Sequence, residues 1–190
     1  MKKILMVYAT REGQTEKITY HISERLRKNG AETEVLNARD IDQHQQLELA
    51  SFDLLVFGAS MHAGGIEKEL LHFLKKQAAT IAPMPRCLFL VLLSAALEDE
   101  TERNTALADA SHKLRKQLPL TFDHIEMIGG ALMYSKYPLP LRWMMKRIAL
   151  KAGQGTDTKK DYEYTDWAQV DAFADTLLEK SSASVALDEA

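Results

Sequence analysis

The stretch "KILMVYATREGQT", residues 3 to 15, decides the fold of this chain. Its first half is an apolar run without polar alternation, which is typical of a strand covered on both faces. After it, Ile18, Ile22 and Leu26 recur at i, i+4 and i+8, which predicts a helix over residues 14–28. A buried strand, a short turn and a helix together form the opening unit of an α/β fold.

The same alternation continues along the chain. Further strands are predicted at residues 33–38, 52–60, 86–94 and 122–133, and further helices from residue 65, around 107–118, and after an N-cap at Thr165. Right-handed crossovers leave few packings for such a pattern. We therefore predict an α/β fold with a doubly wound, five-stranded parallel sheet and helices on both faces. It forms a single domain over residues 1–180, followed by a frayed tail at 181–190.

Composition limits the classes of function. The 190 residues are 46% apolar and 27% charged, with a net charge of −3, so wholesale electrostatic binding of nucleic acid is not expected. The first apolar run is too short for a signal peptide, and no run approaches the roughly 18 apolar residues that span a bilayer. The one cysteine, Cys87, excludes an internal disulfide, lies in an apolar run and suits the reducing cytoplasm.

The turn after the first strand carries the pattern T-x-x-G-x-T, from Thr10 to Thr15. Its hydroxyls, with backbone N–H groups that open a helix, are suited to hold a phosphate. No Lys-Ser/Thr pair follows Gly13, so it is not a Walker loop, and it lacks the G-x-G-x-x-G pattern of dinucleotide sites. The alternative is a plain helix-capping turn.

Two more loops are expected beside this turn, because ligands of doubly wound sheets bind at the carboxyl ends of the strands. "GAS" (58–60) ends the third strand, and Ser94-Ala95 ends the fourth. Small residues here would let a flat ring approach the backbone, although each loop taken alone is also ordinary turn chemistry.

These three loops resemble the FMN site of the flavodoxins, whose phosphate loop usually reads S/T-x-T-G-x-T. Glu12 stands here at a hydroxyl position, which is unfavourable beside a phosphate unless it turns outward or Arg11 offsets it. The resemblance implies a bound FMN. Its candidate contacts are Thr10, Arg11, Glu12, Gly13, Gln14, Thr15, Ser60, Met61, His62, Ser94, Ala95 and Ala96.

A long connection, residues 134–164, separates the fifth strand from the last helix. Its residues 139–151 predict a helix with two apolar faces: Leu141, Met144, Met145 and Ile148 on one, and Leu139, Trp143 and Leu150 on the other. Cations lie on the borders, and no acidic residue occurs between 127 and 156. Such a helix needs two apolar partners. One is the domain itself, and the other is a ligand, a second subunit or a membrane. The alternative is a buried crossover helix.

With "TREGQT", "GAS", "GGALMYSKYP", this basic insert (133–160), "TDTKK" and "YTDW", the chain resembles the bacterial quinone-dependent protoporphyrinogen IX dehydrogenases over residues 3–180. Two features depart from the family. Members often carry Arg-Tyr and a further His after "GAS", where this chain has Met61-His62-Ala63-Gly64-Gly65, and a paired glycine is split as Gly153-Gln154-Gly155.

The resemblance implies that FMN takes electrons from protoporphyrinogen IX, two at a time, and passes them to a membrane quinone, menaquinone or ubiquinone, in heme biosynthesis. The candidates for contact with substrate propionates or anionic lipid are Arg142, Trp143, Lys146, Arg147 and Lys151, whose charges are otherwise simply solvated. His62 is the candidate proton relay, with an ordinary turn histidine as the alternative. Residues 136–151 should be dispensable for holding FMN.

Two rival functions remain from the sequence. A flavodoxin electron carrier has the same fold but a strongly acidic flavin face, which the basic insert disfavours. A soluble NAD(P)H:quinone reductase would need a nucleotide fingerprint, which the chain lacks. The histidines show no metal-ligand spacing, so no metal is expected. We expect the protein in the cytoplasm, peripheral on the inner membrane, with self-association left open.

Overall fold

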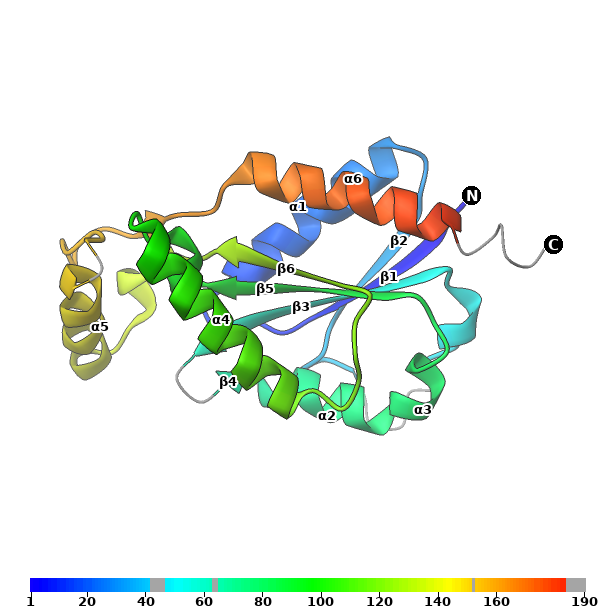
Figure 1. Ribbon diagram of the computed structural model, residues 1–190, viewed down its shortest axis with the longest axis horizontal. Helices are drawn as coiled ribbons and strands as arrows, with labels where there is room; N and C mark the ends of the chain where they lie inside the picture. The colour runs from blue at the N-terminus through cyan, green and yellow to red at the C-terminus, as the bar shows by residue number, and fades with distance from the viewer. Residues whose placement is uncertain (42–46, 63–64, 152, 184–190) are drawn as a thin grey trace.

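The computed structural model describes residues 1–41, 47–62, 65–151 and 153–183 (Figure 1). Its central sheet has five parallel strands in the order β2 (Glu32–Asn37), β1 (Lys3–Tyr8), β3 (Leu54–His62), β5 (Arg86–Leu92) and β6 (His124–Gly129). In this doubly wound order, the chain adds β2 on one side of β1 and then β3, β5 and β6 on the other side. The predicted α/β fold with a parallel sheet is confirmed.

Six α-helices surround the described sheet: α1 (Gln14–Lys28), α2 (Lys68–Lys76), α3 (Ala78–Ile81), α4 (Glu100–Gln117), α5 (Leu139–Lys151) and α6 (Trp167–Ala183). Figure 1 shows α1 and α6 on one face of the sheet and α2, α3 and α4 on the other. The strands end at the left of this view, and α5 stands beyond them. The short helices are η1 (Leu49–Ser51), η2 (Leu93–Ala96) and η3 (Tyr134–Lys136).

Strand β1 explains why its sequence is apolar without alternation. Leu5 and Val7 belong to the core beneath α2 and α4, whereas Ile4 and Met6 belong to the core beneath α1 and α6. All four are buried. Since neighbouring side chains of a strand point to opposite faces, a sheet covered on both sides needs apolar residues at every position.

The helix predicted from residue 65 begins later, at Lys68. Gly65 and Ile66 instead form β4, an antiparallel strand that pairs with Met61 and His62 of β3. Gly65 has a φ of 105°, which lies outside the helical region and favours glycine. The chain therefore turns back on β3 before it enters α2, which the apolar spacing of the helix could not indicate.

Thr165 does not cap the last helix. The carboxylate of Asp166 accepts hydrogen bonds from the N–H groups of Ala168 and Gln169, at 2.9 and 3.2 Å. The Thr165 hydroxyl donates to the carbonyl oxygen of Gly129 at 2.7 Å and ties this segment to the end of β6. Helix α6 continues past the predicted domain end, and positions 184–190 of the predicted tail lie outside the described residues.

The insert forms a small unit at the carboxyl ends of the strands. The fifth predicted strand divides into β6 and β7 (Ala131–Leu132), and β7 pairs with β8 (Tyr162–Glu163). Helix α5 has the predicted bounds. Ala149 of this helix packs with Leu132, Tyr134 and Tyr137 in a separate apolar cluster, so the insert has a core of its own.

Candidate functional site

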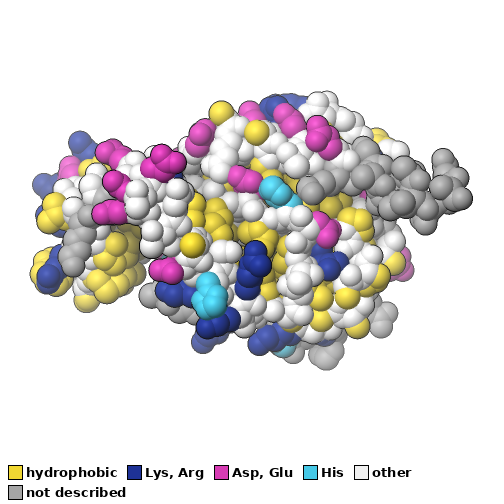
Figure 2. Space-filling view, viewed as in Figure 1, with side chains coloured by type: hydrophobic (Ala, Val, Ile, Leu, Met, Phe, Trp, Pro, Cys, Tyr) yellow, Lys and Arg dark blue, Asp and Glu magenta, His cyan; other side chains and the backbone are white. Residues whose placement is uncertain are grey.

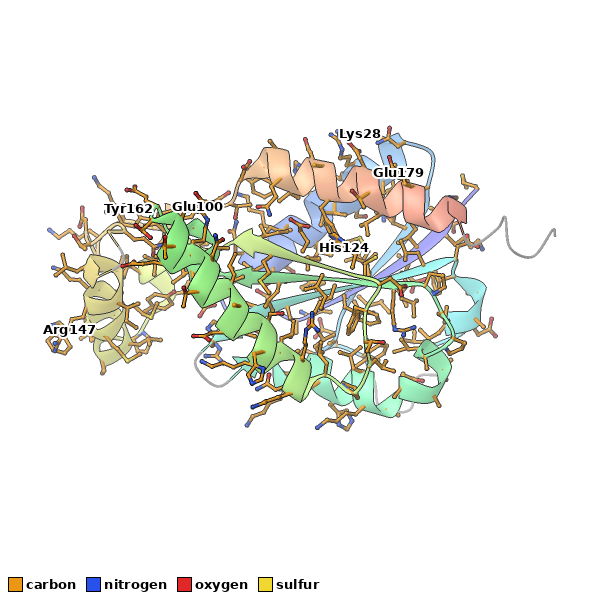
Figure 3. The ribbon with its side chains drawn as sticks, viewed as in Figure 1. Lys28, Glu100, His124, Arg147, Tyr162 and Glu179 are labelled. Atoms are coloured by element: carbon orange, nitrogen blue, oxygen red, sulfur yellow. The ribbon has the colours of Figure 1, made fainter. Side chains whose placement is uncertain are left out.

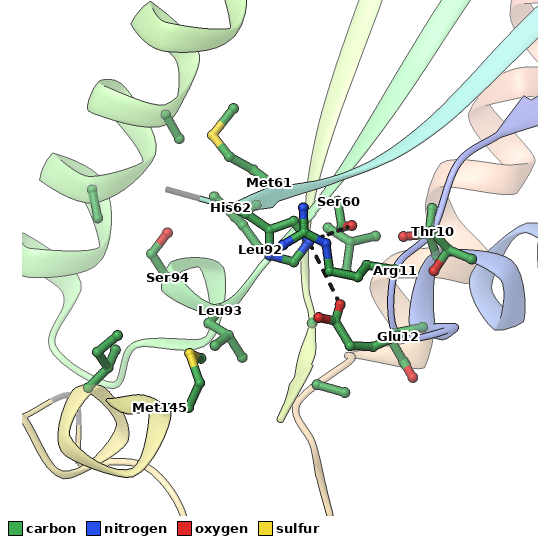
Figure 4. A pocket seen from close by; sticks show the side chains of 18 of the residues that line it. Thr10, Arg11, Glu12, Ser60, Met61, His62, Leu92, Leu93, Ser94 and Met145 are labelled. Carbon is green, nitrogen blue, oxygen red and sulfur yellow. Dashed lines mark hydrogen bonds and ion pairs between the residues drawn. The ribbon is translucent and has the colours of Figure 1, made fainter. Parts of the chain in front are cut away.

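A cavity of about 530 Å³ lies at the carboxyl ends of β1, β3 and β5, within the usual range for small-molecule sites (Figure 4). Loops after β1, β3 and β5 form one side, and α4 and α5 form the other. Its lining includes Thr10, Arg11, Glu12, Gln14, Thr15, Ser60, Met61, His62, Leu92, Leu93, Ser94, Asp109, Lys113, Tyr137, Leu141, Met144, Met145 and Ile148. The three predicted loops therefore meet at one site.

The loop before α1 has the geometry of an anion site. Gly13 has a φ of 101°, and its N–H donates to the hydroxyl of Thr10 at 2.9 Å. Thr15 is only 1% exposed, and its hydroxyl has no hydrogen-bond partner within the described chain; Gln14 Oε1 is in the same state. Because a buried polar atom without a partner is unfavourable, the Thr15 hydroxyl fits a ligand that accepts a hydrogen bond from the loop, whereas Gln14 Oε1 can only accept one.

A polar cluster at the end of β3 lies beside this loop. Glu67 is 7% exposed and accepts hydrogen bonds from both the backbone N–H and the hydroxyl of Ser60, the former at 3.1 Å. His62 Nε2 lies 3.1 Å from Ser60 Oγ, 3.4 Å from Glu67 Oε1 and 3.7 Å from Glu12 Oε2. In Figure 4, dashed lines run from the same edge of the His62 ring to Ser60 and to Glu12.

This cluster determines which nitrogen of His62 carries hydrogen. The Ser60 hydroxyl already donates to Glu67, so its oxygen can accept from Nε2. All three groups that face Nε2 are acceptors, which places a hydrogen on Nε2. In the neutral ring, Nδ1 is then the nitrogen that accepts a proton.

The position of Glu12 differs from both alternatives that the sequence allowed. Its side chain does not turn outward but lines the cavity, and its partner is His62 rather than Arg11. A buried glutamate before a helix, Glu67, was the missed member of this cluster. Its signal in the sequence was weak, because a glutamate just before a helix is common on surfaces as well.

The second and third loops contribute unevenly. Ser60, Met61 and His62 line the cavity from β3, and Ser94 lines it from η2. Ala95 packs against the core beneath α4. Ala96 lies beside Gly129, with its methyl group 3.4 Å from the position that a Cβ atom would take on that glycine. The roles of Ala95 and Ala96 as cofactor contacts stay predictions.

Helix α5 uses its two apolar faces differently. Leu141, Met144, Met145 and Ile148 line the cavity. On the opposite face, Leu139, Trp143 and Leu150 are 76%, 63% and 69% exposed. Figure 2 shows this apolar and basic surface at the left end of the molecule. One face therefore closes the site, and the other has no cover in the described chain.

The basic residues of the insert also separate into groups. Arg142 is half-buried, and its guanidinium donates to the carbonyl of Tyr137 at 3.3 Å, so it belongs to the inside of the insert. Lys146 and Arg147 are exposed. Arg147 lies over the Trp143 ring at 5.1 Å and points away from the domain (Figure 3). The side chain of Lys151 lies outside the described residues.

The structure adds cavity residues that the sequence reasoning missed. Asp109 and Lys113 reach it from α4, one turn apart on the same helix face. Tyr137 reaches it from the insert, and its burial raises the pKa of its hydroxyl to about 12, so the ring is neutral. The insert also touches the loop before α1, because Lys136 Nζ donates a hydrogen bond to the carbonyl of Glu12.

The described residues include neither a metal cluster nor a membrane-spanning helix. No group of three or more His, Cys, Asp or Glu side chains among them is arranged to hold a metal ion. None of the helices in this part of the chain combines the length and the apolar character that crossing a bilayer requires.

Comparison with known proteins gives consistent relatives. The family profile described as a flavodoxin domain matches residues 5–159. The chain is 32% identical over 173 residues to the protoporphyrinogen IX dehydrogenase (quinone) of Escherichia coli K12, covering 90% of this chain and 92% of that protein. It is 30% identical over 174 residues to the Leishmania major protein of the same name, covering 90% and 73%. Oxidised flavodoxin 2 from Bacillus cereus is similar in structure, with a TM-score of 0.47 and 22% identity, covering 67% of this chain and 84% of that one.

Proposed function

Because the chain belongs to the flavodoxin-domain family and to the protoporphyrinogen IX dehydrogenases (quinone), we propose that it oxidises protoporphyrinogen IX with FMN and passes the electrons to a quinone. Each round removes two electrons and two protons from the tetrapyrrole and reduces one quinone to a quinol. Three rounds give protoporphyrin IX. The observation that carries the proposal is a cavity with a phosphate-type loop at one end and the apolar face of α5 at the other.

FMN fits the residues of this site. The unpartnered hydroxyl of Thr15, the backbone N–H groups at the start of α1 and the left-handed Gly13 suit its phosphate. We assign the ring system to the walls made by Met61 and Ser94. When bound, FMN supplies the two-electron chemistry, and the protein supplies binding and orientation.

The inner face of α5 suits the tetrapyrrole and the quinone. Both molecules are large and apolar, and Leu141, Met144, Met145 and Ile148 give the cavity an apolar wall. Lys113 stands at the same cavity on α4 and suits a substrate propionate. In this arrangement the wall orients the substrate, and orientation provides much of the rate gain of such sites.

His62 is the proton acceptor that we propose for this reaction. Its Nε2 is fixed by Ser60, Glu67 and Glu12, so the ring is held in one orientation with Nδ1 available as a base. Each round of oxidation releases protons inside a cavity with apolar walls, where a neighbouring base assists their departure.

The outer face of α5 suits the surface of an anionic membrane, where the quinone resides. Lys146 and Arg147 contribute about 1 kcal/mol each near such a surface. Leu139, Trp143 and Leu150 add apolar area, and together these contributions suffice for reversible attachment without a spanning helix. A second subunit on this face is the competing outcome.

A donor comparison under anaerobic conditions tests the function. Purified protein, loaded with FMN and supplied with menaquinone, is given protoporphyrinogen IX or NADPH, and porphyrin fluorescence and flavin reduction are followed. We expect oxidation of protoporphyrinogen IX and no reduction of the flavin by NADPH. Reduction by NADPH alone would favour a quinone reductase, and turnover of neither donor would favour an electron carrier.

Vesicle flotation tests the membrane contact separately. The protein is mixed with neutral or anionic vesicles at low and at high salt, and its oligomeric state is measured by light scattering. Binding to anionic vesicles at low salt is expected. A stable dimer that ignores the vesicles would show that a second subunit covers the outer face of α5.

A further inference from the structure

We propose that Lys136 is a phosphate ligand of the bound FMN and links the insert to the cofactor. The proposal rests on the proposed binding of FMN, and it concerns a residue of the insert rather than of the loop itself. It differs from the expectation that residues 136–151 are dispensable for holding FMN, since the first of these residues contacts the phosphate-type loop.

The ammonium group of Lys136 lies against the backbone of that loop. It donates a hydrogen bond to the carbonyl of Glu12, and a side chain added to Gly13 would begin 3.1 Å from it. An ammonium has three hydrogens, so others remain for an anion at the same place. The unpartnered hydroxyl of Thr15, in the next residues of the loop, indicates that an acceptor binds there.

The backbone on both sides of Lys136 is held firmly. Tyr134 is fully buried and donates to the carbonyl of Gly155 at 3.0 Å, and Tyr137 is buried as well. Between them, Ser135 donates to Asp161 through its N–H at 2.8 Å and through its hydroxyl at 2.5 Å. Since these contacts fix the start of the lysine side chain, less entropy is lost when it binds an anion.

The charge balance at the loop also favours a cation from outside it. A phosphate carries about −1.5 to −2 charges at pH 7. The loop carries one cation, Arg11, and one anion, Glu12, whose carboxylate faces His62. The added charge of Lys136 therefore offsets the dianion, since the loop has no net charge of its own.

A consequence is that the cofactor and the insert stabilise each other. FMN phosphate that binds both the loop and Lys136 ties η3, and with it the start of α5, to the domain. By linkage, FMN should then stabilise the insert as much as the insert stabilises bound FMN. Riboflavin, which has the same ring but no phosphate, should not have this effect.

Flavin titration of the apoprotein tests the proposal. Quenching of flavin fluorescence gives the Kd for FMN and for riboflavin in wild type, Lys136→Gln and Lys136→Arg, with Lys159→Gln as a matched control elsewhere on the insert. At low salt, Lys136→Gln should raise the Kd for FMN about tenfold and leave that for riboflavin within about twofold, because a charge-assisted contact to phosphate is lost. Lys136→Arg should restore most of the affinity.

Other outcomes overturn the proposal or its premise. Unchanged FMN affinity in Lys136→Gln, or equal loss of both flavins, would show that Lys136 only ties two loops together. Failure of the wild type to bind FMN would instead refute the proposed function. Hydrogen exchange of residues 134–151 in the wild type needs no variant: protection by FMN but not by riboflavin is expected, and equal protection would refute the link.

Discussion

Replacement of Thr15 by valine should change two properties in opposite directions. The side chain is 1% exposed, and its hydroxyl has no partner in the described chain, although valine has the same shape. Burial of a hydroxyl without a partner costs about 1–3 kcal/mol. The apoprotein of Thr15→Val should therefore be about 1 kcal/mol more stable, which raises the Tm of a chain of this size by about 2–4 °C.

The same substitution should weaken the binding of FMN. A hydrogen bond to a charged group contributes about 1.5–3 kcal/mol, so its loss raises the Kd roughly ten- to hundredfold. Thermal unfolding of the apoprotein and flavin titration measure the two effects.

Thr19→Val is the matched control for these measurements. Its hydroxyl is also buried but donates to the carbonyl of Thr15 at 2.7 Å. The control should lose about 1 kcal/mol of stability and keep its affinity for FMN. If Thr15→Val destabilises the apoprotein, or binds FMN as tightly as wild type, the assignment of this hydroxyl to the phosphate is wrong.

Three further substitutions probe the insert. Hydrogen bonds from Ser135 hold the pKa of Asp161 below its usual value, so Asp161 stabilises the fold above about pH 4 and loses this effect as the pH falls. Asp161→Asn should lower the stability at pH 7 and flatten its decline toward pH 3, as measured by urea unfolding. Met145→Lys puts a charge in the cavity wall and should lower tetrapyrrole oxidation at least tenfold, about 1.4 kcal/mol, with a normal flavin spectrum; full turnover would contradict this. Trp143→Glu should reduce flotation with anionic vesicles and leave the FMN content unchanged, whereas unchanged flotation would exclude the outer face as the membrane contact.

The sequence predicted those parts of the fold and site that depend on local periodicity. The bounds of α1 and α5 and the two faces of α5 follow from the spacing of apolar residues, because a helix places residues at i, i+3 and i+4 on one side. The meeting of three loops followed from the alternation of strands and helices, since the carboxyl ends of parallel strands share one edge.

The contacts that the sequence did not predict join residues far apart in the chain or depend on one side-chain rotamer. Lys136 reaches Glu12 across most of the sequence, and no local pattern marks that pair. The partner of Glu12 is His62 rather than its neighbour Arg11, because the turn directs the carboxylate into the cavity. Asp166 caps α6 in place of the predicted Thr165, because the hydroxyl of Thr165 donates a hydrogen bond to the carbonyl of Gly129.

The position of α5 gives a reason why one helix carries two apolar faces. If the proposed donor and a membrane quinone both reach this cavity, its wall has to be apolar and has to lie near the membrane. A helix about 10 Å across places its inner residues, such as Met145, at the cavity and its outer residues, such as Trp143, on the exposed surface that we propose faces the bilayer. If Lys136 binds the phosphate, loss of FMN would also loosen the start of this helix. The insert would then hold its working position only when the cofactor is bound.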